Sequence, residues 1–153
     1  MGEIKLMSPT KHVIMSGAVS LGFFAITKSW GGSMACFLSG IFIDIDHVFD
    51  FWVVKRRLLF SYKELFAFGG REKNVPLCLI FHSYELLAIF AIVIFIFHLN
   101  VVWLGFFWGA LTHLGADQFT NPIKPPAYFL YYRFKYRFDK EYLFKKEYYQ
   151  YMV

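Results

Sequence analysis

Four long apolar runs dominate the pattern of the chain, at about residues 9–28, 33–54, 76–98 and 101–119. Each provides roughly the 20 residues that a helix needs to cross a lipid bilayer. Ser8 and Pro9 begin the first run as an N-cap and a first-turn proline. The pattern therefore predicts an all-α fold, an integral membrane four-helix bundle.

The composition supports this prediction. The chain has 153 residues, of which 58% are hydrophobic, and its mean hydropathy is +0.44. So short a chain cannot bury that much apolar surface in its own core, so we expect a single membrane domain over residues 1–153. Residues 120–153 alternate aromatic and basic side chains. We interpret them as a cytoplasmic tail at the lipid headgroups, and we expect no nucleic-acid partner.

The positive charges are distributed unevenly along the chain. Of the 16 lysines and arginines, all except Lys28 lie before or at the start of the first run, in the 55–75 segment or after residue 119. With four spans, these three segments share one side of the membrane. The positive-inside rule places that side in the cytoplasm. The prediction is a multi-pass protein of the inner (plasma) membrane with both termini in the cytoplasm.

Ten polar or ionisable side chains interrupt the apolar runs. Nine of them lie toward the predicted cytoplasmic ends: His12, Asp44, Asp46, His47, Asp50, His82, Glu85, His113 and Asp117. Only His98 lies toward the opposite end. Gly105 and Gly109 lead in steps of four to His113 and Asp117, a stripe of small residues that favours close helix contact. The polar groups are therefore predicted to face the interior of the bundle.

The cost of these groups indicates what they bind. An ionised residue near the centre of a span costs roughly 2.5–3.5 kcal/mol, and the spans hold no basic counter-ion beyond Lys11 and Lys28 at their edges. Carboxylates clustered with imidazoles are typical ligands of a divalent metal, with zinc favoured and manganese or iron as alternatives. The predicted metal ligands are His12, Asp44, Asp46, His47, His82, His113 and Asp117.

The number of ligands leaves the number of ions open. The candidates exceed the three or four protein ligands that one zinc needs. Two ions would use them more fully, and one ion with a larger set of supporting groups is the alternative. Asp44 and Asp46 lie too far apart in helical phase to point at one ion together. One of them would then be a ligand and the other a supporting group, or each would serve a different ion.

The motifs that carry these residues resemble a known family. His12 in T-K-H, D-I-D-H at 44–47, H-S at 82–83 and H-L-G-A-D at 113–117 resemble, in order, the YdjM-type membrane-bound metal-dependent hydrolases, a LexA-regulated inner-membrane family. The resemblance spans residues 10 to about 120. Many members carry a further His-Arg before the H-S motif, which VPLCLIFHS lacks here, while Glu85 follows His82 by three. The resemblance implies a branch with an altered ligand set.

The sequence therefore predicts a membrane-embedded, metal-dependent hydrolase whose site faces the cytoplasm. Bound metal would activate water and polarise a phosphoryl or acyl oxygen, and Glu85 or Asp50 would act as general base or supporting group. The expected partners are membrane lipids, and the expected substrate is a phosphoester, a lipid or a lipid-linked phosphate. A metal-stabilised structural or regulatory membrane protein without catalysis is one alternative, and an ion-handling protein is another.

Overall fold

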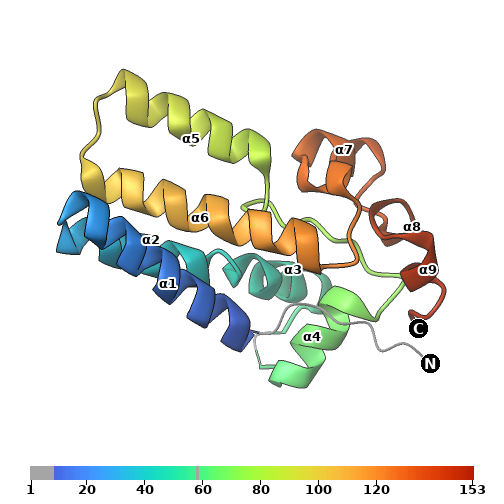
Figure 1. Cartoon of the computed structure of the whole chain (residues 1–153). Helices are drawn as coiled ribbons and strands as arrows, with labels where there is room; N and C mark the ends of the chain where they lie inside the picture. Colours follow the sequence, from blue (N-terminus) through green and yellow to red (C-terminus); the bar gives the residue numbers. More distant parts are fainter. Residues whose placement is uncertain (1–8, 58) are drawn as a thin grey trace. The chain divides into compact units, whose positions relative to one another are not determined.

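The computed structural model describes residues 9–57 and 59–153. Within these residues the regular secondary structure is entirely helical (Figure 1), so the all-α class is confirmed. The chain divides into two compact units. In the described chain, unit 1 comprises residues 44–83 and 120–153, and unit 2 comprises residues 9–43 and 84–119.

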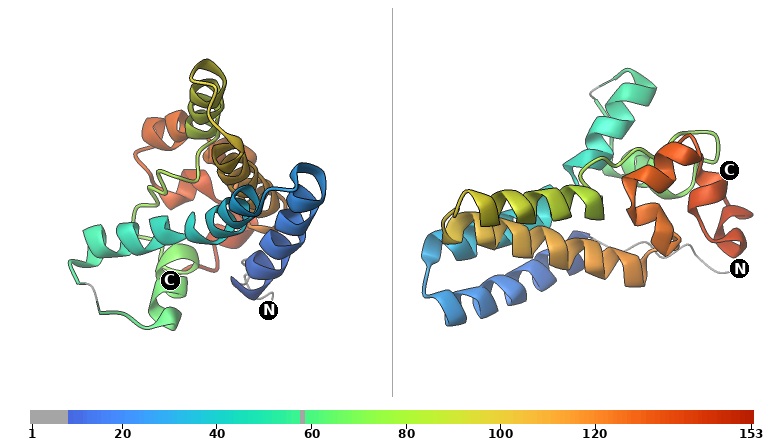
Figure 2. Two further views of the ribbon diagram at one scale, coloured as in Figure 1. Left: turned by 90° about the vertical axis from the view of Figure 1, so that its left-hand side faces the viewer. Right: turned by 90° about the horizontal axis from the view of Figure 1, so that it is seen from above.

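Unit 2 is built from four helices: α1 (Pro9–Thr27), α2 (Trp30–Phe42), α5 (Tyr84–Ile96) and α6 (Val101–Thr120). Helices α1 and α2 form an antiparallel hairpin (Figure 2). Ser29 caps α2 by accepting a hydrogen bond from the Gly32 N–H at 3.1 Å. The Ser33 hydroxyl donates to the Ser20 carbonyl of α1 at 2.6 Å. The turn between the two helices is therefore fixed by serine side chains.

Glycines allow α6 to lie directly against α2. A Cβ atom added at Gly105 would lie 2.0 Å from the Gly32 carbonyl oxygen, and one added at Gly109 would lie 2.1 Å from that of Cys36. No larger residue fits at either position without moving the backbone. The predicted small-residue stripe is thus confirmed, and it continues along α6 to His113.

Unit 1 is built from one 3₁₀ helix and five α-helices: α3 (Ile45–Lys55), α4 (Tyr62–Gly70), η1 (Pro125–Tyr128), α7 (Leu130–Lys135), α8 (Lys140–Leu143) and α9 (Lys146–Tyr149). Its core joins Leu77 and Leu79 to Leu143, Phe144 and Met152, all at most 5% exposed. Residues 120–153 are thus part of a packed core. The prediction that this segment is a separate tail at the lipid headgroups is wrong, because its apolar side chains pack against Leu77 and Leu79.

The prediction of an integral membrane bundle is also wrong. Among the described residues, the structure contains no helix that is both long and apolar enough to cross a bilayer. The run at 33–54 is divided by a turn at Ile43–Asp44, and the run at 76–98 becomes helical only at Tyr84. Helix α5 thus has 13 residues, or about 20 Å of rise, against about 30 Å of bilayer hydrocarbon. The same finding contradicts the predicted multi-pass localisation in the inner membrane.

Candidate metal centre

Unit 2 brings together three of the predicted ligands, His12 on α1 with His113 and Asp117 on α6. We call these three residues the α1–α6 cluster. His12 Nε2 lies 3.2 Å from Asp117 Oδ1, and His113 Nε2 lies 3.5 Å from Asp117 Oδ2. The two imidazole rings stack with centroids 4.1 Å apart and planes 17° from parallel. All three side chains are buried, at 4%, 0% and 4% exposure.

A hydrogen bond to the Gly40 carbonyl determines which ring nitrogen of His113 faces Asp117. Its Nδ1 lies 2.8 Å from the Gly40 carbonyl oxygen, which can only accept, so Nδ1 carries the proton. Nε2 of His113 then faces the Asp117 carboxylate, and either a proton on Nε2 or a metal cation between the two atoms makes this contact favourable. A backbone carbonyl on the far nitrogen is a common support of a metal-ligating histidine.

Unit 1 brings together four further predicted ligands, Asp44, Asp46 and His47 around α3 and His82 in the loop before α5. We call these the α3–loop cluster. His82 Nε2 lies 3.4 Å from Asp44 Oδ1, and His47 Nε2 lies 3.9 Å from the same oxygen. His82 is buried, whereas the Asp44 and His47 side chains are 35% and 29% exposed. One edge of this cluster is therefore open to solvent.

Asp46 orients His82 from the opposite side of the ring. Its Oδ2 atom lies 3.2 Å from His82 Nδ1 and accepts the His82 backbone N–H at 3.0 Å. This carboxylate favours the proton on Nδ1 and leaves the lone pair of Nε2 toward Asp44. Asp44 therefore lies where it could bind an ion together with His82, and Asp46 supports the His82 ring, which is one of the two arrangements that the helical phase allows.

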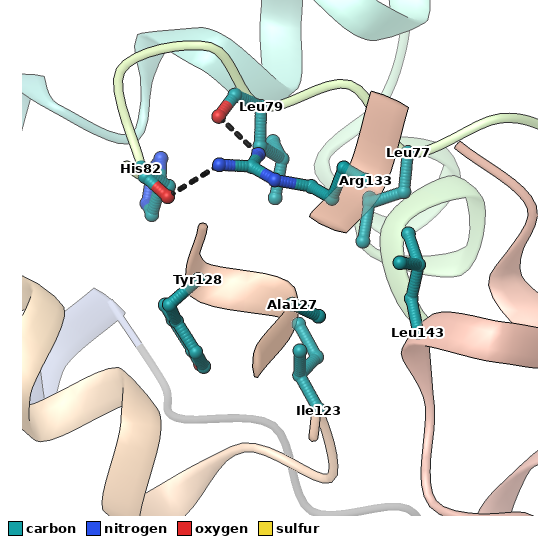
Figure 3. Close-up of a pocket in the computed structure, with 8 residues that line it drawn as sticks. All are labelled: Leu77, Leu79, His82, Ile123, Ala127, Tyr128, Arg133 and Leu143. Atoms are coloured by element: carbon teal, nitrogen blue, oxygen red, sulfur yellow. Dashed lines mark hydrogen bonds between the residues drawn. The ribbon is translucent and has the colours of Figure 1, made fainter. Parts of the chain in front are cut away.

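The loop that presents His82 is held at both its N–H and its C=O groups. Asp50 Oδ2 accepts the N–H groups of Cys78 at 2.7 Å and Leu79 at 3.1 Å. Arg133 of α7 donates to the Cys78 carbonyl. As Figure 3 shows, it also donates to the carbonyls of Leu79 and, at 2.7 Å, His82. Leu79 adopts a left-handed φ of 42°, a strained conformation for leucine that these bonds maintain.

Burial shifts the pKa values of two groups near this loop, Asp50 and Lys140. It raises the pKa of Asp50 above its ordinary value, and the two N–H donors offset the shift only in part. Lys140 of α8 is fully buried and donates to the carbonyls of Phe68 and Glu72. Burial lowers the pKa of the Lys140 ammonium to about 8. Asp50 contacts backbone here, and its predicted role as general base stays a prediction.

Within each unit, the spacing of the donor atoms fits a metal ion. The donors that could hold one are Asp44 with His82 in unit 1 and His113 with Asp117 in unit 2. Bonds of 2.0–2.1 Å to a tetrahedral zinc place neighbouring ligand atoms roughly 3.3–3.4 Å apart. The His82–Asp44 and His113–Asp117 separations of 3.4 and 3.5 Å match that value. Charge-assisted hydrogen bonds between the same groups would be shorter, about 2.7–2.9 Å.

The structure thus assembles seven of the nine predicted site residues into two clusters and places the other two elsewhere. Asp50 holds the 78–79 backbone, and Glu85 is half-buried in the first turn of α5. The sequence predicts Arg133 only as one of several basic residues that could hold an anionic substrate, and its bonds to the loop were missed because arginines in such a basic-aromatic stretch are usually exposed. Arg133 is 1% exposed in the structure. No signal in the sequence separates it from its basic neighbours.

Comparisons with known proteins add no relative. No protein-family model, curated protein or solved structure matches the chain. The resemblance to the YdjM-type hydrolases therefore stays a prediction, and the function has to be argued from the site itself.

Proposed function

We propose that the protein is a divalent-metal-dependent hydrolase that acts on a phosphoester. The donor types support zinc first, since imidazole nitrogen and carboxylate oxygen both suit it, and manganese or iron second. A divalent ion held by these donors would polarise a phosphoryl oxygen and activate a water.

The observation that carries the proposal is the open edge of the α3–loop cluster. Asp44 is about one-third exposed, while His82 beside it is buried and held by Asp46. Catalytic metal sites keep a position open to water or substrate, whereas structural sites are closed by protein ligands. A catalytic metal site is expected to combine a donor that water can reach, here Asp44, with a buried and oriented histidine, here His82.

The charge of the chain supports an anionic substrate. The net charge is +5 with neutral histidines, which favours the approach of anions. Phosphomonoesters, phosphodiesters and the phosphate groups of lipids share this chemistry, and the site gives no reason to prefer one. The burial of the α1–α6 cluster supports a second candidate, a protein in which the metal stabilises the fold without catalysis.

The experiment measures the metal content of the purified protein by elemental analysis. It then measures the rate at which the protein hydrolyses p-nitrophenyl phosphate, bis(p-nitrophenyl) phosphate and dispersed phosphatidic acid. The matched pair is His113→Gln and His98→Asn, since His98 is exposed in unit 2 and asparagine tolerates its φ of 48°. We expect bound metal and hydrolysis in the wild type and His98→Asn, and loss of both in His113→Gln. Bound metal that raises the melting temperature without hydrolysis of any substrate would instead establish the structural role.

A further inference from the structure

The two oxygens of Asp117 contact two different histidines. Oδ1 lies 3.2 Å from His12 Nε2, and Oδ2 lies 3.5 Å from His113 Nε2. A carboxylate that supplied both oxygens to one ion would direct both histidines at the same point. Here the two rings lie one above the other, nearly parallel, with centroids 4.1 Å apart. Each ring therefore accompanies its own oxygen.

This arrangement matches a carboxylate that bridges two ions. Two-metal hydrolytic sites hold their ions about 3.5–4 Å apart, close to the separation of the stacked rings. We infer that unit 2 holds a second divalent ion, between His12 Nε2 and Asp117 Oδ1, beside the ion on His113 Nε2 and Asp117 Oδ2. The inference rests on the proposed metal-dependent function and adds to unit 2 a second ion that has His12 as a ligand.

The surroundings of His12 are consistent with a ligand. The residue is 4% exposed, and its Nδ1 atom has no hydrogen-bond partner among the described residues. The Ser16 hydroxyl, one turn later on α1 and 2% exposed, also has no partner in the described chain. A buried histidine placed only for packing would be expected to satisfy both nitrogens. Ligation at Nε2, with a water between Nδ1 and the serine, satisfies both.

Few protein ligands surround the second position. Within unit 2 it has one histidine nitrogen and one shared carboxylate oxygen, so water would complete its coordination. We expect the second ion to bind more weakly than the first, because the first ion repels it.

The test is a titration of metal-free protein with Zn²⁺, followed by electron paramagnetic resonance of the Mn²⁺-loaded protein. We expect two equivalents of zinc in the wild type, the second bound at least tenfold more weakly, and an exchange-coupled manganese signal. His12→Ala and His12→Gln should bind one equivalent and give the six-line signal of isolated Mn²⁺. Lys11→Ala, at the exposed neighbouring position on α1, should behave as the wild type.

The outcomes separate this inference from the proposed function. One equivalent in the wild type, or two in both His12 variants, overturns the second ion and leaves the metal-dependent hydrolase standing. No bound metal in the folded wild type overturns both. The glutamine variant keeps the size and polarity of the side chain, so the result does not depend on the alanine variant folding normally.

Discussion

Replacement of Arg133 by methionine tests how the His82 loop is held. The guanidinium is 1% exposed and donates to the carbonyls of Cys78, Leu79 and His82. Hydrogen bonds to a charged group contribute about 1.5–3 kcal/mol each, and removal of the buried cation recovers several kcal/mol of desolvation. We expect a net loss of about 3–5 kcal/mol in the free energy of unfolding, with three buried carbonyls left without their donor.

The assay is urea unfolding followed by circular dichroism. The conservative Arg133→Lys variant keeps the charge but not the planar fork of donors, so its loss should be intermediate. Lys135→Met, an exposed position of the same helix, should stay within about 0.5 kcal/mol of the wild type. In folded Arg133→Met we also expect zinc affinity to fall about 10–100-fold, because His82 loses its support. A stability within 1 kcal/mol of the wild type, by the same assay, together with unchanged zinc affinity, would refute the reasoning.

Three further predictions follow from the packing and the charges. The pKa of Lys140 falls from 10.5 to about 8 on folding, so the unfolded chain binds more protons than the folded one between these pH values. The free energy of unfolding of the wild type, relative to that of Lys140→Met, should therefore rise with pH by up to about 3 kcal/mol. Urea unfolding at pH 7.5 and 10.5 checks this, and a difference that stays the same at both pH values contradicts it. Gly105→Ala should lower the melting temperature by several degrees, since its Cβ would lie 2.0 Å from the Gly32 carbonyl oxygen, whereas Gly22→Ala, with nothing within 4 Å, should not; equal melting temperatures contradict the close contact. Asp46→Asn should weaken zinc binding about 10–100-fold while the protein stays folded, and an unchanged zinc titration would remove Asp46 from the support of His82.

The long helices were predicted well where local pattern and packing agree. The runs at 9–28 and 101–119 appear as α1 and α6 with nearly the predicted ends, because their glycines and apolar residues suit close helix packing. The runs at 33–54 and 76–98 were not predicted correctly as single helices. Hydropathy reports how apolar a segment is, and it does not report which partners its backbone hydrogen bonds have. The 78–82 loop exists because Asp46, Asp50 and Arg133, from distant parts of the chain, bond its backbone.

The candidate site shows the same division. Spacing alone paired His113 with Asp117, since residues four apart share a helix face. Helical phase separated Asp44 from Asp46 but could not indicate which of them would bind an ion. That depends on the orientation of the His82 ring, which belongs to a segment some 35 residues later. The stacking of His12 on His113 is a contact between two helices that lie far apart in the sequence, which no local pattern reveals.

Zinc K-edge X-ray absorption of the zinc-loaded protein tests the central claim most directly, because it reports which atoms bind the metal. We predict a first shell of nitrogen and oxygen at about 2.0–2.1 Å with the multiple-scattering features of imidazole. A sulfur shell at about 2.3 Å would place the ion on a cysteine instead, and a shell of oxygen alone would exclude the histidines. Either result would contradict the assignment of the metal to the buried histidine and aspartate side chains.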